Sequence, residues 1–256
     1  MTTTKQQELL SKVPEVTFAF WLVKILATTL GETGGDALSM SALNHDYLIS
    51  TLVFEAIFAV AVIIQILAKN FHPIVYWITI VATTTVGTTL ADFVDRSLGI
   101  GYAGGSAILF TLLMGSLWLW YRTLGSVAVK SIQSPQAEMF YWVTIMFSQT
   151  LGTALGDWTA DEKGLGLGYT GAAIVFGCML TAIAVTYYLS KVNCTSLFWA
   201  AFILTRPLGA VVGDFLDKPV AKGGLALDRY QASAALLVLI VLCLYFLPSK
   251  AARKPH

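Results

Sequence analysis

Long apolar stretches alternate with short polar segments along the whole chain, and eight such stretches occur. Spanning a bilayer as a helix takes about 20 consecutive apolar residues, and each stretch is close to this length. The pattern therefore predicts an all-α integral membrane protein with eight transmembrane helices joined by short connections. The predicted spans cover residues 16–36, 47–67, 74–95, 102–121, 139–160, 169–189, 196–216 and 230–247.

A fourfold internal repeat organises these spans. Each odd-numbered span carries a tryptophan, a glycine ten residues later and an aspartate fifteen residues later, in the pattern W-x9-G-x3-[GA]-D. Such a repeat indicates that the chain is built from copies of one unit. Because each unit crosses the membrane twice, we expect parallel repeats with pseudo-fourfold or 2+2 symmetry. The copies are Trp21/Gly31/Gly35/Asp36, Trp77/Gly87/Ala91/Asp92, Trp142/Gly152/Gly156/Asp157 and Trp199/Gly209/Gly213/Asp214.

The repeats predict a single membrane domain at residues 14–248, divided into units 14–69, 70–134, 135–191 and 192–248. Residues 1–13 lack the apolar core of a signal peptide, so we interpret them as a cytoplasmic lead-in and 249–256 as a cytoplasmic tail. Nine basic residues lie in the termini and the even-to-odd connections, against five in the loops after the aspartates. The positive-inside rule then places both termini in the cytoplasm and the aspartates toward the outside.

Composition supports the membrane assignment. The chain of 256 residues is 56% hydrophobic and 12% charged, whereas soluble domains carry roughly 25% charged residues. A net charge of +1 gives no indication of nucleic-acid binding, and the three cysteines lack metal-ligand spacing. We expect the lipid bilayer and a small ion as partners, no nucleic acid and no cofactor. The sequence leaves the oligomeric state open.

The repeated residues share one face of each odd helix when positions are advanced by about 100° per residue. Lipid cannot solvate a polar stripe of this kind, so it should point into the bundle. Small residues four apart let membrane helices approach closely, which makes packing the first interpretation of the glycines. The alternative is that they give a ligand access to the backbone. These glycines are Gly31, Gly35, Gly87, Gly152, Gly156, Gly209 and Gly213.

The repeated aspartates Asp36, Asp92, Asp157 and Asp214 lie near the C-terminal ends of their helices, where the helix dipole disfavours an anion. One interpretation is that each caps a short helix in the following loop. The other is a ring of four carboxylates above the packed helices, which would concentrate cations. The sequence favours neither.

Four charges interrupt the spans without recurring in other repeats: Lys24, Glu32, Glu55 and Arg206. A charge at the bilayer centre costs roughly 2.5–3.5 kcal/mol on insertion scales, so these residues should be paired, functional or both. Internal salt bridges are one interpretation. The other is a proton- or ion-linked site on repeats one and four, with Lys24 and Arg206 tuning the affinity of the carboxylates. Oxygen ligands suit hard divalent cations, so the predicted metal ligands are Glu32, Asp36, Glu55 and Asp214.

Four tandem two-helix units, each with its tryptophan and glycine–aspartate element, resemble a bacterial membrane family described only as a repeat of unknown function. The resemblance covers residues 14 to about 247 and implies a multi-pass protein of the bacterial inner membrane, without naming a substrate. The segment from Gly31 to Asp36 also resembles the E-x-G-D element of small manganese/calcium cation–proton exchangers, although its spacing here is E-x-x-G-D. That second resemblance implies metal cations.

Together these features favour a secondary transporter that exports a divalent metal cation (Mn²⁺-, Mg²⁺- or Ca²⁺-like) in exchange for protons. A transporter or channel for a small organic solute or another ion is the alternative, and a membrane sensor or scaffold is a second. We do not expect an enzyme, because the sequence contains no H-E-x-x-H or G-x-S-x-G motif and the acids have no histidine partners.

Overall fold

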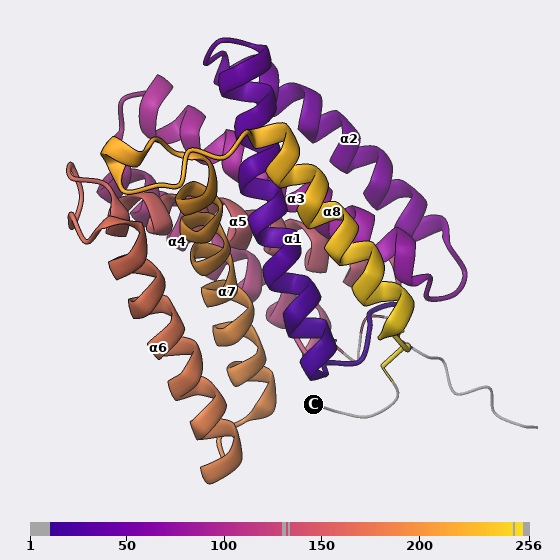
Figure 1. Cartoon of the computed structure of the whole chain (residues 1–256). Coiled ribbons are helices and arrows are strands. Elements are labelled where there is room, and N and C mark those ends of the chain that lie inside the picture. The colour runs from indigo at the N-terminus through magenta and orange to yellow at the C-terminus, as the bar shows by residue number, and fades with distance from the viewer. Residues whose placement is uncertain (1–10, 130–131, 133, 248, 253–256) are drawn as a thin grey trace, which may run out of the picture.

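The computed structural model describes residues 11–129, 132, 134–247 and 249–252, and within them the chain forms eight α-helices (Figure 1). The all-α prediction is confirmed, and each predicted span overlaps one helix. The helices are α1 (Phe18–Asp36), α2 (Tyr47–Leu67), α3 (Pro73–Asp92), α4 (Gly101–Leu124), α5 (Pro135–Ala160), α6 (Gly168–Leu189), α7 (Cys194–Asp217) and α8 (Arg229–Phe246).

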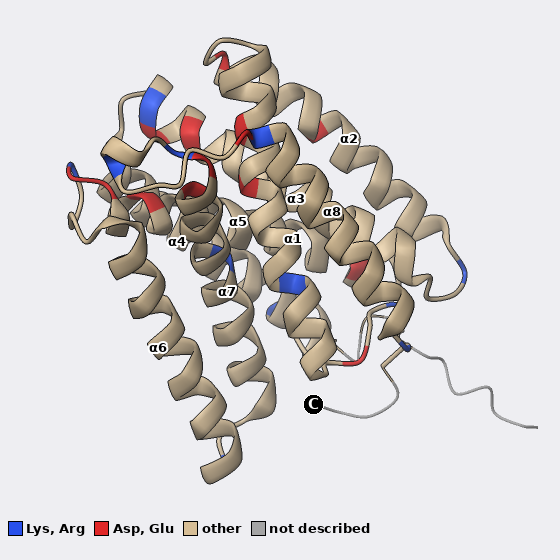
Figure 2. Cartoon of the chain, viewed as in Figure 1, with Lys and Arg blue, Asp and Glu red and all other residues tan. Residues whose placement is uncertain are grey.

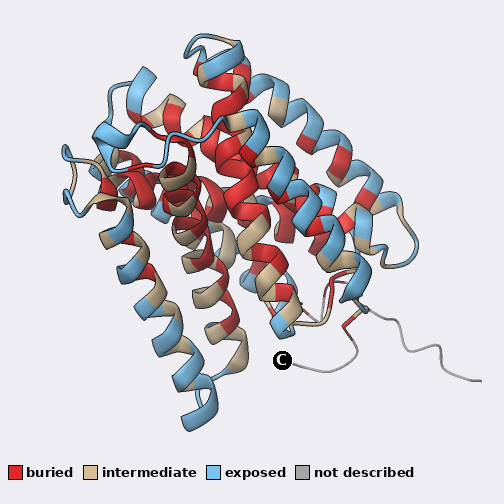
Figure 3. Cartoon of the chain, viewed as in Figure 1, coloured by how far each residue is buried: buried red, intermediate tan, exposed pale blue. Residues whose placement is uncertain are grey.

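The odd-numbered helices form a closed inner ring. In this ring α1 packs against α3, α3 against α5, α5 against α7, and α7 against α1. Each even-numbered helix lies outside the ring and packs on the inner helix of the next repeat: α2 on α3, α4 on α5, α6 on α7, and α8 on α1. Burial is concentrated on the inner helices, whereas α2, α6 and α8 are largely exposed (Figure 3). Repeats one and four are therefore neighbours.

Within the described residues, six helices are long and apolar enough to cross a membrane: α2, α3, α4, α6, α7 and α8. The other two, α1 and α5, belong to the inner ring and have many buried polar residues. Because neighbouring helices shield these residues from lipid, the inner helices can be less apolar than a helix that faces the membrane. The chain thus has the composition and architecture of a helical membrane protein.

Local sequence explains where most helices begin. The side chains of Thr17, Ser134 and Asn193 accept backbone hydrogen bonds at the starts of α1, α5 and α7, and Asp46 and Asp228 do the same for α2 and α8. Such caps satisfy backbone N–H groups that have no partner within the helix. At their other ends α1 and α3 continue into π-helical turns, Ala37–Ala42 (η1) and Phe93–Ser97 (η2), and a 3₁₀ turn at Val220–Lys222 (η4) follows α7.

The bundle has two chemically different ends, which we call the tryptophan end and the aspartate end after the repeated residues near each. At the tryptophan end, an aromatic residue precedes each repeated tryptophan and is buried: Phe20, Tyr76, Tyr141 and Phe198. The hydroxyls of Tyr76 and Tyr141 form a buried hydrogen bond of 2.7 Å. Aromatic packing therefore closes this end of the ring.

The two terminal segments meet at the tryptophan end. Pro14 and Ala251 form an isolated β-bridge, and the backbone N–H of Glu15 donates to the carbonyl of Lys250 at 2.8 Å. Most of the predicted lead-in (1–13) and part of the predicted tail (249–256) lie outside the described residues, as do Lys5, Lys130, Arg253 and Lys254.

Candidate functional site

Arg206 of α7 crosses the axis of the inner ring and contacts the other three inner helices. Its Nη2 donates to Glu32 Oε2 on α1 at 3.0 Å, to Thr88 Oγ1 on α3 at 2.7 Å and to Thr153 Oγ1 on α5 at 2.5 Å. The side chains of Arg206 and Glu32 are 0% and 4% exposed. A buried ion pair is favourable only when further hydrogen bonds satisfy its atoms. Thr88 provides one by donating to Glu32 Oε2 at 3.2 Å.

The repeated glycines make room for these polar side chains. A Cβ added at Gly213 would lie 2.6 Å from the Cβ of Glu32, and one at Gly87 would lie 2.9 Å from the Cβ of Gln149. Such separations are too short for real atoms, so only glycine fits. Four more glycines meet the neighbouring inner helix in the same way: Gly31 at Thr84, Gly35 at Thr88, Gly152 at Arg206 and Gly209 at Thr28. A Cβ at Gly156 would lie 3.2 Å from the Cβ of Ala210, which is a tight but possible contact.

The aspartates of repeats one and four form a pair at the aspartate end, bridged by Lys218. The ammonium Nζ of Lys218 donates to Asp36 Oδ2 and lies 3.0 Å from Asp214 Oδ1. Burial alone would lower the pKa of Lys218, but Asp214 and Asp36 together raise it well above its ordinary value. The lysine is therefore held in its charged form between the two carboxylates.

The aspartates of repeats two and three form a second pair, bridged by Arg96. The guanidinium Nε lies 3.0 Å from Asp92 Oδ1, and Nη2 lies 3.1 Å from Asp157 Oδ2. The Arg96 Nη1 atom also donates to the hydroxyl of Tyr47 at 3.3 Å. Figure 2 shows the resulting collection of acidic and basic residues at the end opposite the chain termini. The helices thus follow fourfold symmetry, while the charges follow twofold symmetry.

Capping does not account for Asp36 or Asp92. Both directly precede a π-helical turn, but neither side chain accepts a capping hydrogen bond from that turn. Asp157 and Asp214 lie in the last turn of α5 and α7. The four aspartates meet at one end of the bundle, but as two pairs that are each bridged by a basic residue and not as an open ring of four carboxylates.

Three carboxylates form a group that fits a metal ion. One oxygen each from Glu32, Asp36 and Asp214 lies within 4.8 Å of the others, and all three residues are buried. In addition, Asp36 Oδ1 is buried and has no hydrogen-bond partner among the described residues. Carboxylate oxygens are the ligands that Mg²⁺, Mn²⁺ and Ca²⁺ prefer. The group spans α1 and α7, the inner helices of repeats one and four, and includes three of the four predicted metal ligands.

Lys24 lies on α1 between this group and the tryptophan end. Its ammonium is 4.0 Å from the centre of the Phe202 ring, a distance typical of a cation–π contact. The residue is 0% exposed, and its Nζ has no hydrogen-bond partner in the part of the chain that the structure describes. Lys24 therefore lies near Arg206 and is not part of the carboxylate group.

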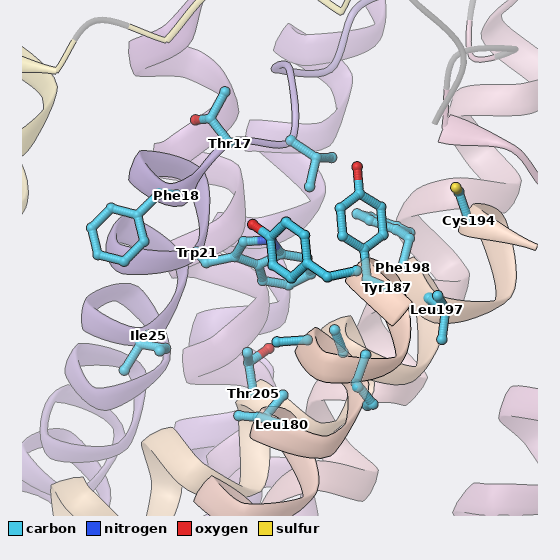
Figure 4. A pocket seen from close by; sticks show the side chains of 15 residues that line it. Thr17, Phe18, Trp21, Ile25, Leu180, Tyr187, Cys194, Leu197, Phe198 and Thr205 are labelled. Carbon is cyan, nitrogen blue, oxygen red and sulfur yellow. The ribbon is translucent and has the colours of Figure 1, made fainter. Parts of the chain in front are cut away.

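A groove of about 510 Å³ opens between α1, α6 and α7 near the tryptophan end (Figure 4). Its lining includes Phe18, Trp21, Tyr187 and Phe198, and no charged side chain is among the described residues that line it. A metal cation needs charge compensation in addition to oxygen ligands, and the described lining of this groove offers hydroxyl groups but no carboxylate. The groove is separate from the carboxylate group.

Comparison with protein families accounts for the repeat. A family described as a Repeat of Unknown Function (DUF347) matches four times in tandem, at residues 19–71, 75–126, 140–193 and 197–250. The chain belongs to this family. Each match covers an odd-numbered helix and the even-numbered helix that follows it. The predicted four-repeat family is therefore confirmed. No curated protein and no solved structure matches the chain.

Of the four predicted metal ligands, Glu55 is the one that the structure does not bring to the others. It is exposed on α2, a helix of the outer layer that packs on α3. Glu32 is the acid that pairs with Arg206. The sequence could not show whether Glu55 faces inward or outward, because α2 is apolar on all sides and its periodicity marks no inner face.

Arg96 and Lys218 are the residues that sequence analysis missed as part of the site. Both had been counted as loop charges. A signal was present, because each stands four residues after the repeated aspartate of its unit, in repeats two and four only. On a helix or its first following turn, this spacing brings the two side chains together. A third basic residue at this end, Arg229, pairs with Asp217 at 2.6 Å.

Proposed function

We propose that the protein is a secondary transporter that exports a divalent metal cation in exchange for protons. The observation that carries this proposal is the group of Glu32, Asp36 and Asp214, three buried carboxylates within 4.8 Å of one another in a helical membrane protein. Acidic residues inside a membrane bundle are costly, and they mark ion pathways when they are retained.

The chemistry of this group supports alternation between a cation and protons. Three ionised carboxylates cannot stay close together in a buried site without positive charge, because their mutual repulsion and loss of hydration are both unfavourable. A bound divalent cation supplies that charge, and so do protons on the carboxylates. Arg206 compensates part of the charge of Glu32 at 3.0 Å. Exchange between the two states couples cation movement to proton movement.

The same architecture supports the orientation that we propose: eight membrane-crossing helices in the bacterial inner membrane, with both termini in the cytoplasm. Basic residues in the loops at the aspartate end argue against placing that end outside, under the positive-inside rule. Three of the five basic residues there, Arg96, Lys218 and Arg229, are held in ion pairs with aspartates. They neutralise the carboxylates of that end and add little free positive charge to its loops.

A transporter fits the packing of the axis better than an open channel does. Arg206 fills the axis by contacting α1, α3 and α5, and the aromatic residues at the tryptophan end close the ring below it. Passage of an ion therefore requires the inner helices to rearrange. Such alternating exposure of a fixed site is the mode of action of secondary transporters with repeated units.

The proposal is tested with purified protein in liposomes that contain a metal-sensitive dye and a pH dye. Mn²⁺, Mg²⁺, Ca²⁺, Co²⁺, Ni²⁺ and Zn²⁺ are added in turn. We expect flux of at least one metal with opposing proton flux, and the loss of both in the double variant Glu32→Gln/Asp214→Asn. Glu55→Gln is the matched control, because it makes the same carboxyl-to-amide change on an outer helix away from the group.

The outcomes separate the function from the residue assignment. Absence of flux for every metal, with protein correctly inserted, would overturn cation transport. Flux that survives in Glu32→Gln/Asp214→Asn, or that is lost equally in Glu55→Gln, would overturn the assignment of the site to the three carboxylates.

A further inference from the structure

The two basic residues that bridge aspartates, Arg96 and Lys218, occupy equivalent places in a twofold arrangement. Arg96 bridges the aspartate of its own repeat to that of repeat three, and Lys218 bridges the aspartate of its own repeat to that of repeat one. Rotation by two repeats interchanges the two bridges. Differences between them are therefore differences in chemistry at matched positions.

Glu32 joins the two aspartates of the Lys218 bridge in a group of three carboxylates, whereas no such group surrounds the Arg96 bridge among the described residues, although Asp95 lies beside that bridge. Glu32 stands eleven residues after its tryptophan, and its oxygen lies within 4.8 Å of both aspartates that Lys218 contacts. In repeat three the residue at this position is Thr153, which donates to the backbone carbonyl of Gln149 and accepts from Arg206. In the part of the chain that the structure describes, only the Lys218 bridge thus lies within a set of carboxylate oxygens suited to a divalent cation.

The two basic side chains also differ in how firmly they are held. Arg96 lies in the π-helical turn η2, and its planar guanidinium uses separate nitrogens for its two aspartates. Lys218 follows the last residue of α7 and has an extended backbone, with φ −74° and ψ 154°. Its ammonium is a compact charge on a flexible stem. Lys218 can therefore leave its aspartates without unwinding a helix.

We propose that the ammonium of Lys218 is a tethered counter-ion that occupies the cation site at rest and is displaced when the transported cation binds. This inference rests on the proposed function and deepens it. Lys218 Nζ uses Asp36 Oδ2 and Asp214 Oδ1. A metal held by Glu32, Asp36 and Asp214 needs oxygens of the same two aspartates, and like charges repel at that separation. The metal and the ammonium are therefore mutually exclusive.

A tethered counter-ion gives the transporter a resting state without a bound metal. The ammonium compensates one of the two charges of Asp36 and Asp214, and a proton on the carboxylate group compensates the other, so the protein does not hold an uncompensated acidic site inside the membrane. It also weakens cation binding, because the apparent affinity falls with the fraction of molecules whose site is free. Weaker binding favours release on the far side of the membrane. The arginine of the other bridge remains in place as a fixed part of the structure.

Mn²⁺ binding to the full-length protein in detergent micelles tests this inference, with free Mn²⁺ measured by electron paramagnetic resonance. Removing the competing charge in Lys218→Met should tighten binding by about tenfold or more, if Lys218 occupies the site in most wild-type molecules. Lys218→Gln, made alongside, keeps a hydrogen-bond donor between the aspartates and should act in the same direction. Arg96→Met is the matched control and should leave the affinity close to that of the wild type.

Chemical rescue provides a second measurement. Lys218→Ala leaves space for a free primary amine, so added ethylammonium should compete with Mn²⁺ in this variant and have little effect on the wild type. Unchanged affinity in Lys218→Met and Lys218→Gln would overturn the tethered counter-ion while leaving cation transport intact. Equal tightening in Arg96→Met would overturn it as well, since the effect would then be general to positive charge. Lack of Mn²⁺ binding by the wild type and by every variant would overturn the inference for Mn²⁺, while the flux of the other five metals would still decide the proposed function.

Discussion

Replacing Arg206 with methionine should destabilise the protein strongly while preserving the volume of its side chain. In the folded protein Nη2 of Arg206 makes hydrogen bonds of 2.5–3.3 Å to Glu32, Thr88, Thr153 and the carbonyl of Thr84. After the substitution, Glu32 remains buried with a hydrogen bond from Thr88 and no positive partner. Removing one member of a buried ion pair costs about 3–5 kcal/mol of the free energy of unfolding.

The magnitude can be followed by thermal unfolding of the purified protein in detergent. For a chain of this size, 1 kcal/mol shifts Tm by about 2–4 °C, so Arg206→Met should lower Tm by on the order of 10 °C. The double variant Arg206→Met/Glu32→Gln removes the charge that was left behind. It should be more stable than Arg206→Met alone, because replacing both members of a buried pair is much less costly than removing one.

A double-mutant cycle of Arg206→Met and Glu32→Gln tests whether the two side chains are coupled. Coupled residues give an interaction energy of about 0.5–3 kcal/mol in such a cycle, whereas independent residues give additive effects. Additive losses of stability would refute the conclusion that these two side chains neutralise each other in the axis of the bundle. Arg206→Lys adds a further check. It retains the charge but lacks the planar group that reaches three helices, so its stability should lie between the wild type and Arg206→Met.

Three further predictions concern the packing of the inner helices, a buried hydrogen bond and a helix cap. Gly87→Ala places a Cβ 2.8 Å from a backbone atom of α5 and should lower the free energy of unfolding by about 1–3 kcal/mol, as measured by thermal unfolding. The control Gly115→Ala, on α4 with no atom within 4 Å of the added Cβ, should be neutral or slightly stabilising. Equal effects of the two substitutions would contradict the close approach of the inner helices. Tyr76→Phe and Tyr141→Phe should each lower the free energy of unfolding by about 1–3 kcal/mol, because each leaves one buried hydroxyl unpaired. The double variant should be more stable than either single variant, since it removes both hydroxyls. A double variant whose loss of stability equals the sum of the two single losses would argue against the hydrogen bond. Asp46→Ala removes the side-chain oxygen that accepts a hydrogen bond from the Ile49 N–H at 3.0 Å, and it should lower the free energy of unfolding by about 1 kcal/mol. Asp46→Asn keeps an oxygen that can accept this bond and should have little effect. Identical stability of the two variants in the same assay would exclude capping.

The extent of the helices and the repeat followed directly from the sequence. Apolar length predicted each helix, and the tryptophan, glycine and aspartate spacing predicted four equivalent units, which agree with the four family matches. The same spacing placed Glu32, Asp36 and Asp214 on inward faces of odd helices, where they form one group. These features are local: helix length depends on consecutive residues, and a helical face depends on a fixed angle per residue.

The partners of the charges could not be predicted in the same way. The sequence predicted that the charges inside the spans are paired or functional without assigning the pairs, and the structure shows that Arg206 pairs with Glu32. The sequence predicted that Lys218 and Arg96 are charges of the loops. In the structure each of them contacts the aspartates of two neighbouring inner helices. Which acid meets which base depends on the relative rotation and height of helices that are distant in sequence.

The sequence by itself thus determined the number of units, the length of their helices and the face that each inner helix turns to its neighbours, because these depend on the order of residues within a few turns. Only the tertiary structure decided that the ring closes between α7 and α1, that even helices pack on the following repeat, and that a fourfold set of aspartates is divided into two bridged pairs. The physical reason is that these features result from side chains of different helices competing for the same space and the same counter-charges. That competition is resolved only when all the helices pack together.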